Sequence, residues 1–133
     1  MNEEDKKIAL QLLIEKSYRH LNQAKQNALL KNWDLVANRL YYAIFHCVTA
    51  LLLNDNIEVK THKGRAQQFG QHYVLTGKFL REDGKLYNNL QRMREEADYN
   101  NVFILTEDEA LKLIQQTEKL HQKIILYLNL VQI

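Results

Sequence analysis

Apolar residues recur along the chain at steps of three and four, which is the spacing of one face of an α-helix. Near the N-terminus the apolar stripe runs through Ile14, Tyr18, Leu21 and Ala24, and it predicts a helix from about Glu4 to Leu30. No stretch shows the sustained apolar–polar alternation of a strand. The chain also has no proline and only four glycines, so little in it interrupts helices.

The pattern predicts a second helix from Asp34 to Leu53, with Asn32 as its candidate cap. This segment is apolar nearly all round, which is typical of a central helix or of a subunit interface. Four of its polar residues nevertheless fall within about 80° of one another on a helical wheel. They are Arg39, Tyr42, His46 and Thr49. Asn38 lies outside this polar stripe.

Three more helices follow from the pattern. A short one is predicted around Lys63–Tyr73, and another begins at Glu82 or Lys85 and ends near Asp98. Tyr99, Asn100 and Asn101 are expected to form a turn. Thr106 and Glu109 match a capping box at the start of the last helix, whose stripe runs from Leu111 to about Leu128. We therefore predict one all-α domain over residues 1–133, an antiparallel bundle of four long helices and a short one.

Composition narrows the class of protein. The 133 residues carry 18 basic and 16 acidic side chains, a balance that does not indicate nucleic-acid binding by net charge alone. One cysteine, Cys47, excludes an internal disulfide framework and a cysteine-rich zinc module. The N-terminus is acidic where a signal peptide would be basic. The apolar run Tyr41–Leu53 is too short to span a bilayer, so we expect a cytoplasmic protein with no membrane segment.

Neither a metal nor a cofactor is expected. Five histidines are present, but none pairs with another at metal-ligand spacing on a helix face; they are His20, His46, His62, His72 and His121. The chain also lacks a phosphate-binding glycine loop, a dinucleotide-binding glycine turn and a serine nucleophile motif. Cys47 lies in the middle of an apolar helix, where a thiol is usually inert.

The polar stripe of the second helix is the first candidate site. Arg39 and His46 in an apolar wall would line a polar pocket, and a buried arginine there needs a carboxylate partner. We expect Asp98 to be that partner. In the alternative interpretation, Arg39 extends to solvent and His46 is a histidine of the core with its hydrogen bonds satisfied.

Two further clusters of charge could hold phosphate. Arg92 and Arg94 lie near a helix end, and a guanidinium fits phosphate oxygens, although Arg94 and Asp98 could equally form a surface salt bridge. His62 and Lys63 open the short helix, whose unpaired amides attract anions, although this segment could equally be an ordinary solvated loop.

Three segments, taken together, resemble the HEPN domain family. They are Asn38–His46, Thr61–Gly64 with Phe69–Gly70, and Arg94–Tyr99, and the resemblance extends over about residues 5 to 130. It implies an all-α bundle that dimerises through its central helices. The family includes metal-independent ribonucleases, toxins paired with small nucleotidyltransferase antitoxins, and inactive binding members.

The chain departs from the family at the ribonuclease motif, which is an arginine followed after four to six residues by a histidine. Alignment on Asp98 and Tyr99 places Arg92 at the arginine and Ala97 at the histidine. Alanine cannot transfer a proton, so the usual catalytic site is broken. Arg39 and His46 have the motif's spacing, but on a different helix.

Three functions remain open. The preferred one is a dimeric module that binds a nucleotide, RNA or a partner protein, within a toxin–antitoxin or defence system. The second is a metal-independent endoribonuclease toxin with a rearranged site drawn from Arg39, His46 and Arg94. The third is a structural dimerisation partner. The candidate ligand-binding residues are Arg39, Tyr42, His46, His62, Lys63, Arg92, Arg94, Asp98 and Tyr99.

Overall fold

The computed structural model describes residues 1–100 and 103–131, and these residues form helices and connecting loops without a strand. The elements are α1 (Glu3–Leu29), α2 (Trp33–Asn54), α3 (His62–Phe69), the π-helical turn η1 (Gly70–Val74), α4 (Arg81–Tyr99) and α5 (Glu107–Val131). The predicted all-α bundle is confirmed, and the helix ends differ from the predicted ones by at most a few residues. Asn101, predicted to complete a turn, lies outside the described residues.

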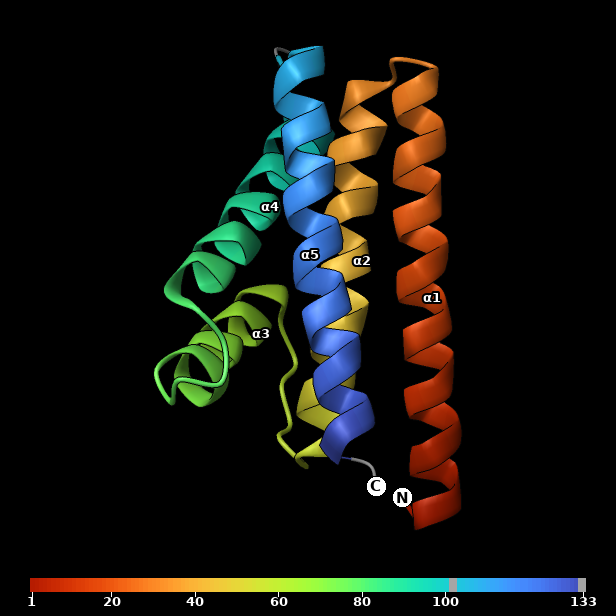
Figure 1. The fold of residues 1–133 in the computed structure, drawn as a ribbon, viewed down its shortest axis with the longest axis vertical. Coiled ribbons are helices and arrows are strands. Elements are labelled where there is room, and N and C mark those ends of the chain that lie inside the picture. Colours follow the sequence, from red (N-terminus) through yellow and green to blue (C-terminus); the bar gives the residue numbers. More distant parts are fainter. Residues whose placement is uncertain (101–102, 132–133) are drawn as a thin grey trace.

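Helix α2 is the centre of the bundle. It packs against α1, α3, α4 and α5, with α1 and α5 running alongside it and α3 and α4 leaning across it (Figure 1). Eleven of its residues are buried within this single chain. The all-round apolar character that suggested a subunit interface is therefore explained by contacts inside one protomer.

By length and composition, α2 could cross a membrane, which the shorter run Tyr41–Leu53 did not suggest. An 18-residue window of α2 has a mean hydropathy of 1.4, but 61% of that window is buried inside the bundle. Among the described residues, no other helix passes this test. The apolar surface of α2 is thus used for packing against its neighbours.

Two of the predicted caps can be compared with the structure. Thr106 and Glu109 form the reciprocal capping box: the Thr106 amide donates to Glu109 Oε1 at 3.3 Å, and the Glu109 amide donates to Thr106 Oγ1 at 3.2 Å. Asn32 does occupy the N-cap position of α2, but its side chain makes no capping hydrogen bond.

Two aromatic or aliphatic residues assigned to core stripes are exposed. Tyr18 is 46% exposed and Leu111 is 50% exposed. In α1 the residue next to Tyr18, Ser17, is buried instead, and its hydroxyl lies 2.8 Å from Nε2 of the buried His121 in α5. A hydrogen-bonded polar pair thus replaces apolar packing where α1 meets α5, and hydrophobic periodicity cannot show this.

The short helix predicted around Lys63–Tyr73 is present but changes its form. It is α-helical to Phe69 and then widens into η1, where the Leu75 amide donates to the Gly70 carbonyl at 2.9 Å. Tyr73 anchors this turn to the centre of the bundle, because its hydroxyl donates to the Leu51 carbonyl at 3.0 Å. The turn therefore holds α3 and η1 against α2 on the side where α4 also packs.

Candidate functional site

Arg94 is a buried arginine on α4. The residue is only 8% exposed, although it follows two residues after the exposed Arg92. Its guanidinium carbon lies 5.1 Å from the ring centre of Tyr41, 5.8 Å from that of Tyr42 and 6.0 Å from that of Tyr99. These distances are those of cation–π contacts. Arg94 does form an ion pair with Asp98, but the pair is not an ordinary surface salt bridge, because Arg94 is buried.

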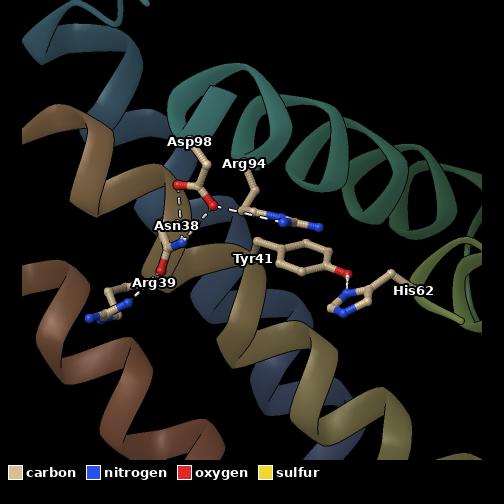
Figure 2. Close-up of polar contacts among 6 residues, drawn as sticks. All are labelled: Asn38, Arg39, Tyr41, His62, Arg94 and Asp98. Carbon is tan, nitrogen blue, oxygen red and sulfur yellow. Dashed lines mark hydrogen bonds and ion pairs between the residues drawn. The ribbon is translucent and has the colours of Figure 1, made fainter. Parts of the chain in front are cut away.

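Asp98 links Arg94 to α2. Its Oδ2 lies 3.7 Å from Arg94 Nη1, and both carboxylate oxygens accept from Asn38 Nδ2, at 3.2 and 3.3 Å (Figure 2). The ion pair is long, and Arg94 Nε is buried without a hydrogen-bond partner in the described part of the chain. Arg94 thus keeps unused donor capacity.

The expected pairing of Asp98 with Arg39 is corrected by the structure. Arg39 points toward α1, and its Nη1 donates to Asn38 Oδ1 (Figure 2). Asn38 takes the place beside the carboxylate because one residue along a helix turns the side chain by about 100°. Sequence reasoning missed Asn38 because it lay outside the polar stripe, although it opens one of the segments that resemble HEPN domains.

His62, the first residue of α3, completes the cluster from the other side. Its Nδ1 lies 2.6 Å from the hydroxyl of the buried Tyr41, and its ring stacks on Phe45 with centres 4.5 Å apart. Thr61 sets this position by capping α3, since its hydroxyl accepts from the Gly64 amide at 2.8 Å. Figure 2 shows Arg94, Tyr41 and His62 in a row across the faces of α4, α2 and α3.

Burial keeps the titrating groups His62 and Tyr41 of this cluster uncharged. Desolvation, followed by the charges of Arg94 and Arg65, lowers the pKa of His62. Burial raises the pKa of Tyr41 to about 12. At neutral pH, His62 and Tyr41 are thus an uncharged hydrogen-bonded pair beside a guanidinium.

His46 lies apart from this cluster, on the side of α2 that faces α1. Its ring centre is 4.9 Å from that of His20 and 6.0 Å from that of Tyr42. Desolvation, followed by the charges of His20, Lys16 and Arg65, lowers the pKa of His46 to about 4. Arg39 also points toward α1, and no hydrogen bond joins it to His46 within the described residues (Figure 2).

The remaining candidates lie around the Arg94 cluster. Tyr99 ends α4 and is 79% exposed. Arg92 faces solvent, where it pairs with Glu96 at 2.8 Å. Arg92 and Lys63 both line a groove between α3, η1 and α4. Thr49 has the backbone partner expected of a structural residue, because its hydroxyl donates to the Phe45 carbonyl at 2.7 Å.

The Arg94 cluster brings cationic and aromatic groups together but lacks the parts of a metal centre in the described part of the chain. Within residues 1–100 and 103–131, no three histidine, cysteine or carboxylate side chains gather at metal-binding distances. Cys47 is buried, and burial raises the pKa of its thiol, so it is a poor nucleophile. What the cluster does offer is a buried guanidinium whose Nε has no partner among the described residues, flanked by aromatic rings and an imidazole.

Comparison with known proteins identifies the family. The sequence model of the HEPN domain family matches residues 10–126, which are most of the chain. A UPF0332 protein of Thermotoga maritima is 34% identical over 89% of this chain and 88% of its own. Two Methanocaldococcus jannaschii proteins are also similar. "Putative toxin MJ0605" is 38% identical over 82% of this chain and 81% of its own, and "Putative toxin MJ0142" is 30% identical over 83% and 75%. The chain therefore belongs to the HEPN domain family.

Proposed function

We propose that this protein binds the phosphate of a nucleotide or RNA at the Arg94 cluster without cutting it. The observation that carries the proposal is the state of Arg94: a buried guanidinium, one long ion pair to Asp98, and an Nε without a partner among the described residues. A guanidinium matches phosphate oxygens with two parallel donors, so a phosphate that reached this buried group would supply the acceptor that Nε lacks.

The side chains around Arg94 suit the rest of a nucleotide. Tyr99 is exposed at the end of α4 and lies within cation–π distance of Arg94, so a base can stack on its free ring. His62 keeps Nε2 available, because Nδ1 is engaged with Tyr41. These groups can contact base and sugar while Arg94 holds the phosphate.

Binding without cleavage is preferred because the proton-transfer groups are poorly matched to the task. Metal-independent RNA cleavage needs an acid and a base whose pKa values lie near the working pH. Ala97 stands where the family histidine would be, and His46, with a pKa of about 4, is almost wholly neutral at pH 7. Because so little of His46 is protonated at pH 7, it is poorly suited to act as the acid.

A metal-independent endoribonuclease is the second candidate, now built on Arg94 and His62 rather than on Arg39 and His46. It is favoured by the position of His62 next to the only arginine that the structure buries among the described residues. The names of the two similar proteins from Methanocaldococcus jannaschii also point to toxicity.

The biological setting follows from the same resemblance. We propose that the chain forms a homodimer in the cytoplasm and works in a toxin–antitoxin or defence pair with a nucleotidyltransferase-type partner. The two relatives named as toxins support the toxin–antitoxin setting. Light scattering of the purified protein would test the dimer, and a monomeric mass at high concentration would refute it.

Fluorescence anisotropy with labelled RNA in EDTA tests the function. We expect binding that weakens with salt, by about 0.7 in the logarithm of the binding constant per log unit of salt for each phosphate contact. Arg94→Met should weaken binding at least tenfold, whereas Lys7→Met, on an exposed part of α1, should not. Intact RNA after long incubation supports a binding module. Fragments that disappear with His62→Ala would establish the second candidate, and absence of binding would refute both.

A further inference from the structure

A groove of about 970 Å³ lies between α3 with η1 on one side and α4 on the other. Its rim carries four cations and a single carboxylate, Glu95. The cations are Lys63, Arg81, Lys85 and Arg92. Lys63, Arg81 and Lys85 form no ion pair within the described part of the chain. The rim of the groove therefore has an excess of positive charge even though Arg92 is paired with Glu96, on a protein whose net charge is only +2.

The helical spacing explains why the groove is continuous. The groove residues of α4 recur at steps of four, three and four, so they share one face of the helix. They are Arg81, Lys85, Asn88 and Arg92. From Arg81 to Glu95 the lining of α4 extends for about 21 Å at 1.5 Å per residue. A channel of this length accommodates several linked phosphates rather than one.

Side-chain amides inside the groove offer hydrogen bonds in addition to charge. Gln67 and Gln71 line the wall formed by α3 and η1, and Asn88 and Gln91 line the wall formed by α4. The side-chain oxygen Oε1 of Gln91 is buried and receives no hydrogen bond from the described residues.

The groove joins the Arg94 site. Arg92 and Glu95 line it and also line a shallow hollow that contains Arg94 and Tyr99. On the opposite wall, Lys63 is the neighbour in sequence of His62. The ligand of the Arg94 site can therefore extend into the groove without leaving the protein surface.

We infer that the groove between α3, η1 and α4 binds single-stranded RNA as it leaves the Arg94 site, so that the ligand is an RNA strand of several nucleotides rather than a mononucleotide. Because the strand starts at the phosphate site proposed above, the groove has this role only if Arg94 binds RNA. The cations hold successive phosphates, and the amides contact ribose or base edges.

Gly70 provides a variant that fills the groove without disturbing the fold. It lines the groove, and a Cβ built on it meets no atom within 4 Å. Its φ of −60° and ψ of −47° are ordinary helical values that leucine adopts readily. Gly70→Leu should therefore fold normally while its side chain occupies the channel.

The test compares a ribodinucleotide with a single strand of about 12 nucleotides, within the range of site sizes of single-strand-binding folds. Anisotropy is measured for wild type, Gly70→Leu and the double variant Arg81→Ala/Lys85→Ala. Both variants should weaken binding of the long strand and leave the dinucleotide unchanged. Removing two phosphate contacts should lower the salt slope by about 1.4, equivalent to about 25-fold in affinity at 0.1 M salt relative to 1 M.

The matched control is Lys7→Ala/Lys112→Ala, which removes the same charge from α1 and α5 outside the groove. If this control weakens the long strand as much as Arg81→Ala/Lys85→Ala does, the effect is one of net charge and the groove assignment is wrong. If wild type binds the dinucleotide and the long strand with equal affinity, and Gly70→Leu changes neither affinity, the groove does not bind RNA. That result would leave the Arg94 site intact. Failure of both RNAs to bind would overturn the Arg94 site itself.

Discussion

Replacing Arg94 with methionine tests whether this arginine contributes to the stability of the fold or to binding of a ligand. A structural buried ion pair costs about 3–5 kcal/mol when one partner is removed, because the other charge stays buried and uncompensated. Here the Asp98 side chain is 31% exposed and keeps its hydrogen bonds to Asn38. Loss of Arg94 therefore strands no charge, and the structural penalty should not arise.

The contacts of Arg94 allow the balance to be worked out. Methionine gives up cation–π contacts with tyrosine rings, worth about 1–2 kcal/mol in a desolvated site. It also gives up an ion pair at 3.7 Å, worth at most about 1 kcal/mol. In return it removes a buried N–H group without a partner, whose desolvation costs about 1–3 kcal/mol. Because the central values of these terms nearly cancel, the free energy of unfolding should change by no more than about 2 kcal/mol.

Urea denaturation followed by circular dichroism measures this change. Asp83→Ala is the matched control, because Asp83 is a buried carboxylate with structural partners: its Oδ2 accepts from the Leu80 amide at 2.8 Å and from Lys123 Nζ. That variant should lose about 2 kcal/mol through the lost helix cap and ion pair. A loss of 3 kcal/mol or more in Arg94→Met would show that Arg94 holds the fold together, and would refute the reasoning that keeps it for a ligand.

Three other measurements test the remaining structural conclusions. Burial lowers the pKa of His121 to about 4, with smaller and opposing effects from Lys25 and Glu118. The unfolded chain therefore binds more protons than the folded chain between pH 6.5 and 4. As the pH is lowered through this window, the free energy of unfolding should fall by up to about 3 kcal/mol, and by less in His121→Gln. A free energy of unfolding that does not change with pH would contradict the buried state of His121. Cys47 should react with a thiol reagent only after denaturation, since its thiol is buried and its pKa is raised. Gly77→Ala should cost about 1 kcal/mol because Gly77 has a φ of +82°, whereas Gly70→Ala, at φ −60°, should cost nothing; equal effects would exclude backbone strain as the cause.

The sequence predicted the helices well because their signals are local. Apolar spacing, the absence of proline and the box formed by Thr106 and Glu109 are all read within a few residues. The widening at Gly70 could not be predicted in this way. It depends on the anchoring of Tyr73 to the Leu51 carbonyl, a contact between residues far apart in sequence.

The candidate site was predicted in part. Arg94, Asp98 and His62 do meet around α2, but the burial of Arg94 contradicts the usual expectation that arginine faces solvent. The partner of Asp98 was missed by one position, Asn38 in place of Arg39. A helical wheel orders residues around one axis, but it does not show which neighbouring helix covers each sector.

The central position of α2 also sets how different parts of the site should open to solvent. Amide hydrogens of α2 are shielded by four neighbouring helices, so their exchange with deuterium should require global unfolding. Arg94 and Asp98 belong to the last turns of α4, and a helix end can fray independently of the rest of a fold. Half of the site is thus fixed in the slowest-exchanging segment of the chain. The other half belongs to the last two turns of α4, whose amides should exchange sooner than those of α2.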